Sequence, residues 1–89
     1  MFRRKKYKMK FRKSHQFVNW GVYKEITDAS LMSCLLQLHR KYDFEIVATK
    51  FKDCFSNSYI KIKCNQEDKN KIFTDYCLSL DGYIEAISF

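Results

Sequence analysis

Apolar and basic residues alternate along residues 7–12, close to the start of the chain. One side of the alternation is apolar and the other is basic: Tyr7, Met9 and Phe11 against Lys8, Lys10 and Arg12. A period of two residues is typical of a strand with one buried face. Chance alternation in a disordered basic segment is the competing interpretation, and the pattern alone leaves both open.

Two later segments carry apolar residues at helical spacing. In the first, one stripe recurs at intervals of four, three and four residues: Leu31, Leu35, Leu38 and Tyr42. Thr27 or Asp28 can cap this helix, because either side chain accepts hydrogen bonds from free backbone N–H groups. The second helix has an apolar face of five residues: Ile72, Phe73, Tyr76, Cys77 and Leu80. Asn65 can cap its start, and Gly82 follows where a left-handed residue often ends a helix.

Four other segments are predicted to be strands. Residues 16–24 alternate with Val18, Trp20 and Val22 on one face, and Gly21 marks a bulge or a close backbone approach. Residues 44–51 place Phe44, Ile46 and Ala48 on one side. Residues 59–64 alternate cleanly, with Ile60, Ile62 and Cys64 inward and Tyr59, Lys61 and Lys63 outward. Residues 83–89 form the last strand, with Ile84 and Ala86 on one face.

Counted from residue 16, the predicted elements follow the order β-α-β-β-α-β. This order fits a four-stranded antiparallel sheet with both helices on one face, the ferredoxin-like α+β sandwich. With 89 residues, of which 46% are hydrophobic, the chain has room for one small domain with a core. The basic segment before it is then an N-terminal arm or an extra edge strand.

The net charge of +7 is concentrated in that segment. Residues 1–13 hold eight basic residues and no acidic one, whereas residues 14–89 hold nine basic and ten acidic residues. This distribution predicts a basic arm over 1–13 on a near-neutral domain over 14–89. Clustered cations favour a polyanion as partner, and nucleic acid is the commonest one. A solvated arm that only aids solubility is the alternative.

The candidate nucleic-acid-binding residues fall into two groups. The first is the basic arm: Arg3, Arg4, Lys5, Lys6, Lys8, Lys10, Arg12 and Lys13. The second is the sheet face without helices, with Tyr59, Lys61 and Lys63, which Phe17 and Tyr23 would join. Lysines can follow phosphates and aromatic rings can stack on bases. Residues 58–63 lack the Gly-aromatic signature of RNA-recognition motifs, so these residues also fit an ordinary solvated strand.

The residue types needed for catalysis do not occur in a recognisable arrangement. Ser14 and His15 stand outside any nucleophile elbow, and Cys34 and His39 are five residues apart, which is poor spacing on a helix. Two glycines cannot form a phosphate-binding loop, and no Cys-x-x-Cys pair suggests zinc. We therefore expect a protein that is not an enzyme and has no cofactor and no metal.

The four cysteines and the absence of an apolar segment bear on location. Cys34, Cys64 and Cys77 fall on apolar faces and are expected to be reduced core residues, whereas Cys54 lies in a polar loop and is expected to be exposed. No apolar run approaches the roughly 18 residues of a membrane span, and no secretory signal pattern follows the basic N-terminus. We expect a cytoplasmic protein that does not bind membranes.

A second hypothesis belongs to a different class. The chain would be an interaction protein or inhibitor of the kind that phages and mobile elements encode. It would dock on a host protein, for example a nucleic-acid enzyme. Trp20 is then an anchor for that partner, since tryptophan is enriched at binding hot spots, instead of a core residue. An exposed sheet edge or face can also pair two copies into a homodimer.

Overall fold

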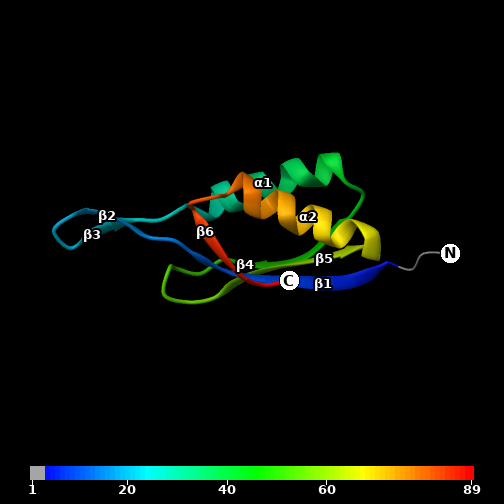
Figure 1. Ribbon diagram of the computed structural model, residues 1–89, viewed down its shortest axis with the longest axis horizontal. Coiled ribbons are helices and arrows are strands. Elements are labelled where there is room, and N and C mark those ends of the chain that lie inside the picture. Colours follow the sequence, from blue (N-terminus) through cyan, green and yellow to red (C-terminus); the bar gives the residue numbers. More distant parts are fainter. Residues whose placement is uncertain (1–3) are drawn as a thin grey trace.

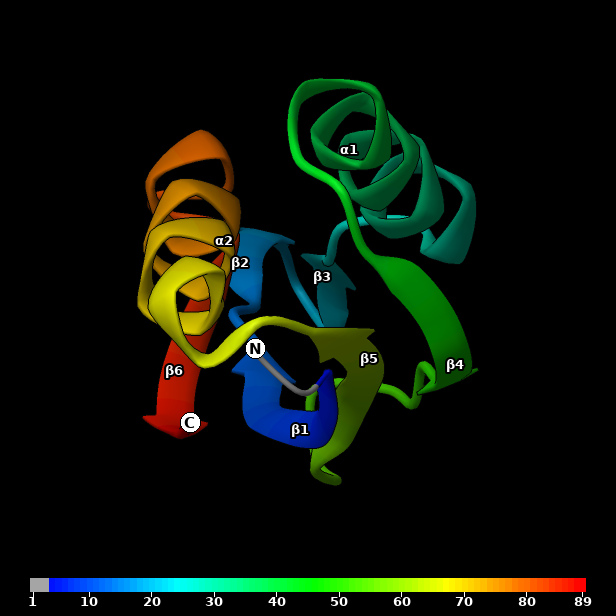
Figure 2. The same cartoon turned by 90° about the vertical axis from the view of Figure 1, so that its right-hand side faces the viewer.

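The computed structural model describes residues 4–89, apart from the side chains of Phe17 and Val22. Its elements follow in the order β1 (Lys5–Lys13), β2 (Gln16–Asn19), β3 (Val22–Lys24), α1 (Asp28–Lys41), β4 (Glu45–Lys50), β5 (Ser58–Cys64), α2 (Gln66–Ser79) and β6 (Ile84–Ser88). One antiparallel sheet has the strand order β4-β5-β1-β6. Both helices cover the same face of this sheet (Figure 1, Figure 2). The predicted ferredoxin-like sandwich is confirmed.

The basic segment is the first strand of this fold. β1 lies inside the sheet, between β5 and β6, and is neither an arm nor an edge strand. Met9 and Phe11 are fully buried under the helices and Tyr7 is half-buried, so the predicted strand with one buried face is confirmed. The Phe11 ring centroid lies 6.0 Å from that of Tyr76 in α2. Burial of these apolar side chains explains why so basic a segment occupies the centre of a sheet.

The segment expected to be the first strand lies outside the sheet. Residues 16–24 form a hairpin of β2 and β3, and among residues 4–89 these two strands pair with each other alone. The chain turns at Trp20 and Gly21, and Gly21 has φ +68°, a conformation that residues with a side chain rarely adopt. Figure 1 shows the hairpin projecting from one end of the molecule. Trp20 is 92% exposed, so its interpretation as a core residue is wrong.

The two helices begin and pack as predicted. Thr27 caps α1, and its hydroxyl oxygen accepts a hydrogen bond from the Ser30 backbone N–H at 3.1 Å. Asn65 occupies the N-cap position of α2, but its side chain makes no capping hydrogen bond, so only the predicted position is confirmed. The buried core unites both helices with the sheet, and its members are Met9, Phe11, Leu31, Leu35, Leu38, Phe44, Ile60, Ile62, Cys64, Ile72, Phe73, Tyr76, Leu80 and Ile84.

Polar contacts join α1 to α2. The Tyr76 hydroxyl donates a hydrogen bond to the Leu31 carbonyl at 3.1 Å, and burial raises the pKa of this phenol. The Tyr42 hydroxyl donates to the Asp75 carboxylate at 2.6 Å, and the Lys41 ammonium lies 3.2 Å from the same oxygen. The Tyr42 hydrogen bond, with the Lys41 ammonium, holds the pKa of Asp75 below its ordinary value. These contacts fix the helix layer on one side of the sheet.

Two local predictions need correction. In β4 a bulge between Ile46 and Ala48 shifts the register, so Ala48 lies opposite Lys61 and away from the core side. The loop residue Cys54 is 4% exposed, because the loop folds back and its backbone N–H donates to the Glu25 carboxylate at 2.9 Å. All four cysteines are free thiols, and Cys34, Cys64 and Cys77 pack in or against the core as predicted.

Candidate nucleic-acid interface

The face of the sheet opposite the helices displays one side of β1 (Figure 2). Successive side chains of a strand point to opposite sides, so the buried Met9 and Phe11 send their neighbours to this open face. The exposed residues of β1 on that side are Lys6, Lys8, Lys10 and Arg12. Burial of the apolar half of the strand therefore forces half of the basic segment into one exposed row.

The neighbouring strand adds a second row. In β5, Ile60, Ile62 and Cys64 are fully buried, and the residues between them point to the open face, as predicted. The antiparallel register places Lys6 opposite Lys63, Lys8 opposite Lys61, and Lys10 opposite Tyr59. The two predicted groups of binding residues thus meet on one surface. We call this surface the lysine face, and it consists of Lys6, Lys8, Lys10, Arg12, Tyr59, Lys61 and Lys63.

The aromatic residue of the lysine face is in contact with one of its lysines. The Lys8 ammonium nitrogen lies 4.1 Å from the centroid of the Tyr59 ring, in a cation–π contact. Lys8 is the diagonal neighbour of Tyr59 across the strands, within reach of a long side chain. The contact covers one face of the Tyr59 ring. The lysine face therefore presents mainly positive charge and little ring surface for stacking.

Four lysines of this face are placed opposite a like charge. Lys8 faces Lys61 and Lys6 faces Lys63 on adjacent strands, and directly opposed like charges destabilise a sheet. Across residues 4–89 the ion pairs are Arg4–Asp43, Lys13–Glu25, Lys13–Asp28 and Lys41–Asp75. None of them includes a residue of the lysine face. Within the described residues, folding therefore forms no ion pair that neutralises these cations.

The acidic residues that pair with the lysine face across the strands lie on the two outer strands of the sheet. Glu45 of β4 lies opposite Lys63, and Glu85 of β6 lies opposite Arg12. Both belong to the outer strands of the sheet. The positive charge consequently forms a stripe that runs along the two central strands.

Four of the predicted arm residues do not belong to the stripe. Arg3 lies outside the described residues. Arg4 pairs with Asp43, and the hydrogen bond and charge of that carboxylate raise the pKa of the guanidinium. Lys5 begins β1 opposite Cys64, on the side of the helices.

Lys13 has the opposite environment from the exposed lysines of its own strand. Its side chain is 4% exposed, and its ammonium lies 2.5 Å from the Asp28 carboxylate and 3.9 Å from that of Glu25. It has the same parity along β1 as Met9 and Phe11, which sends it to the covered side. Lys13 joins the end of β1 to the start of α1 and is removed from the candidate interface.

The lysine face ends at Arg12, next to the loop between β4 and β5. The Arg12 guanidinium donates to the side-chain oxygen of Asn57 in that loop, at 2.9 and 3.3 Å. Arg12 also lines a shallow hollow of about 440 Å³, together with Glu85, His15 and Phe55.

A cluster of aromatic rings lies at the hollow. The ring of Tyr23 in β3 lies 5.7 Å from that of Phe55 and 5.8 Å from that of His15, measured between centroids. Tyr23 was expected on the open sheet face, but it belongs to the hairpin; the side chain of Phe17 is outside the described part of the chain. Loss of solvent around its hydroxyl is the first cause of the raised pKa of Tyr23. Because this cluster joins residues far apart in sequence, no local pattern predicts it.

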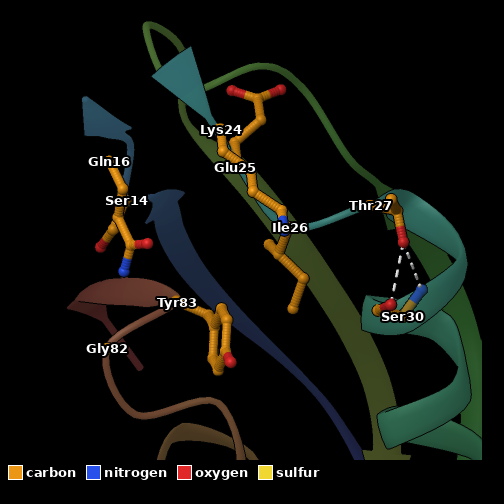
Figure 3. A pocket seen from close by; sticks show the side chains of 9 residues that line it. All are labelled: Ser14, Gln16, Lys24, Glu25, Ile26, Thr27, Ser30, Gly82 and Tyr83. Atoms are coloured by element: carbon orange, nitrogen blue, oxygen red, sulfur yellow. Dashed lines mark hydrogen bonds between the residues drawn. The ribbon is translucent and has the colours of Figure 1, made fainter. Parts of the chain in front are cut away.

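A pocket of about 270 Å³ lies at the base of the hairpin (Figure 3). Its walls come from residues 14–16, from residues 24–30 and from the turn before β6. The Ser14 backbone N–H donates to the Tyr83 carbonyl at 2.9 Å, and the Thr27 hydroxyl oxygen caps α1. The Glu25 carboxylate is held by the Cys54 N–H. Since the fold itself uses these groups, we assign the pocket to the joint between hairpin and sandwich.

Comparisons of the chain with protein-family models, curated proteins and solved structures found no match. The geometry of the lysine face is therefore the basis for a functional assignment. Within the described residues, no cluster of three or more His, Cys, Asp or Glu side chains is placed to hold a metal ion. No helix in residues 4–89 is long and apolar enough to cross a membrane.

Proposed function

We propose that this protein binds nucleic acid through the lysine face and acts by binding, not by catalysis. The observation that carries the proposal is the two pairs of directly opposed lysines, Lys8–Lys61 and Lys6–Lys63, on the two central strands of the sheet. Formation of the core explains the apolar residues on the buried side of these strands. It does not require lysine on the exposed side. Residues that work against folding are expected at functional sites.

A polyanion supplies the counter-charge that the fold does not. Phosphates placed between the two rows would neutralise lysines on both strands and release the counterions condensed on the nucleic acid. The stripe follows the strand direction, so an extended phosphate backbone fits along it. Nucleic acid and free thiols are both found in the cytoplasm, where we place the protein.

The test is fluorescence anisotropy of labelled single- and double-stranded DNA and RNA across a salt series. We expect the double variant Lys8→Ala/Lys61→Ala to bind on the order of tenfold more weakly than wild type. Its log–log salt slope should be smaller by about 0.7 per lysine on single strands and about 0.9 on duplex DNA. The matched control is Arg40→Ala/Lys71→Ala, which removes the same charge from exposed positions on the helices.

Two outcomes would contradict the proposal. One is the absence of binding to any of these polymers at low salt. The other is an equal loss of affinity in the sheet variant and the helix control, which would indicate net charge instead of a defined surface. The helix control should fold and bind like wild type.

A protein-docking function is the second candidate, and the outer strand β6 favours it. This strand has one unpaired edge, and Ile87 and Phe89 near it are 47% and 48% exposed. Such an edge can pair with a strand of a host protein or of a second copy. Retention of a host protein after nuclease treatment, with its loss in Ile87→Lys, would favour this candidate. Sedimentation of the purified protein would report a homodimer.

A further inference from the structure

The tip of the hairpin displays the tryptophan of the chain. Trp20 occupies the turn between β2 and β3, and its side chain is 92% exposed. The Asn19 side-chain oxygen accepts a hydrogen bond from the Trp20 backbone N–H at 2.8 Å, and Gly21 completes the turn with φ +68°. The turn belongs to the hairpin that projects from one end of the molecule (Figure 1), and the exposed ring makes no contribution to the core. Tryptophan is enriched among the residues that carry binding energy, so an exposed tryptophan at this tip is a candidate contact.

Further exposed rings lie between this tip and the sheet. Phe55 is 65% exposed and Tyr23 is 46% exposed, and the two rings touch edge to face with centroids 5.7 Å apart. The Asp53 carboxylate accepts a hydrogen bond from the Phe55 backbone N–H at 3.0 Å, which orients the loop that presents Phe55. The hairpin and the β4–β5 loop together form an aromatic end of the molecule. We define this aromatic end as His15, Trp20, Tyr23 and Phe55.

The aromatic end continues the lysine face. β1 carries its exposed cations up to Arg12, and Arg12 lines the same shallow hollow as His15 and Phe55. The lysine face presents cationic groups, and the aromatic end next to it presents aromatic rings. On the lysine face itself, Lys8 covers one face of the Tyr59 ring, so stacking area is concentrated at the aromatic end.

We infer that the ligand is a single-stranded nucleic acid, with its phosphates on the lysine face and its unpaired bases stacked on Phe55 and Trp20. This inference rests on the proposed function and specifies its substrate class. A single strand presents both phosphates and free base faces, whereas a duplex hides its bases in the helix stack. Stacking on aromatic rings tolerates any base, so the inference includes no sequence preference.

The experiment uses Trp20 as its own reporter, because it is the single tryptophan of the chain. Wild-type protein is titrated with a short oligothymidylate, with the matching duplex and with inorganic polyphosphate, which has the charge but no bases. We expect all three to bind in a salt-dependent manner. Only the oligothymidylate should quench the tryptophan emission, with saturation at the concentration where anisotropy saturates.

Substitutions separate stacking from charge. We expect Trp20→Ala and Phe55→Ala each to weaken oligothymidylate binding on the order of tenfold and to leave polyphosphate binding unchanged. The matched control is Leu78→Ala, which removes an apolar side chain that is 68% exposed on α2 and should change neither affinity. Circular dichroism of each variant reports whether the fold is retained.

The outcomes distinguish this inference from the function on which it rests. If polyphosphate and oligothymidylate bind equally and the tryptophan emission does not change, the stacking inference is overturned and the lysine face remains. If the duplex quenches as strongly as the single strand, the assignment to single strands is overturned. If no polyanion binds, the proposed function itself fails. If Trp20→Ala loses a protein partner but no nucleic-acid affinity, the tip belongs to protein docking.

Discussion

The residues on the two sides of β1 are determined by different requirements. On the covered side, Met9 and Phe11 are fully buried, and any apolar residue of suitable size in these places would support the same fold. On the open side, Lys8 and Lys10 stand in solvent, where folding allows almost any polar residue. Lys8 is nevertheless opposed to Lys61, and Lys6 on the same side is opposed to Lys63. The covered side of β1 therefore accounts for the stability of the sheet. Stability does not explain the lysines of the open side, so we attribute them to function.

The largest expected effect comes from adjacent substitutions on the two sides. Phe11→Ala should lower the free energy of unfolding by about 3–5 kcal/mol, because it opens a cavity beside Tyr76. Lys10→Ala, one residue away, should change it by less than about 0.5 kcal/mol. Urea unfolding followed by circular dichroism measures both. Similar losses in the two variants would break the comparison.

A second prediction compares two lysines of the same strand. Lys13→Met leaves the Asp28 and Glu25 carboxylates without their cation and should lower the free energy of unfolding by about 1–3 kcal/mol. Its affinity for nucleic acid should not change. Lys10→Met should behave in the reverse manner, with near-normal stability and weaker binding. The two variants have equal net charge, so a binding loss in Lys13→Met would show that total charge, not the lysine face, determines affinity.

The third prediction is a small gain in stability from a substitution on the lysine face. Lys61→Glu replaces a like-charged neighbour of Lys8 by an opposite charge and should raise the free energy of unfolding by about 0.2–1 kcal/mol. The gain should shrink at high salt, since exposed charges are screened. It should also shrink in a Lys8→Ala background, which is the matched control. A loss of stability in Lys61→Glu would mean that the opposed lysines do not strain the sheet.

Sequence patterns predicted the fold class because each element has a local signal. The stripe from Leu31 to Leu38, the cap at Thr27 and the alternation through Ile60 and Ile62 depend on neighbours along the chain. These signals are strong because burial imposes them at helical or strand spacing. The inward and outward sides of β5 followed directly.

Which segment forms the first strand of the sheet depends on pairing with strands that are distant in the sequence. Residues 16–24 and residues 5–13 both alternate, and only partners in β5 and β6 decide which joins the sheet. Gly21 is also a local signal, but a glycine within an alternating segment fits a bulge or a close backbone approach as well as the turn that it forms. The parity of Lys13 with Met9 and Phe11 was available in the sequence and would have placed it on the covered side.

The surface features beyond the strands could not be predicted locally. The aromatic cluster brings His15 and Tyr23 to Phe55, which lies more than thirty residues further along the chain. Cys54 is buried because Glu25 holds its backbone, and no feature of residues 53–58 indicates this contact. Such contacts arise when separate elements meet in the folded structure.

Lysine acetylation of the wild-type protein, with and without oligothymidylate, is the most direct test of the central claim. Mass spectrometry reports the reactivity of every lysine in one experiment. We predict protection of Lys8, Lys10, Lys61 and Lys63, with Lys69 and Lys71 on α2 remaining as reactive as in the free protein. Protection confined to the helix lysines, or equal protection of all lysines, would contradict binding through the open face of the sheet.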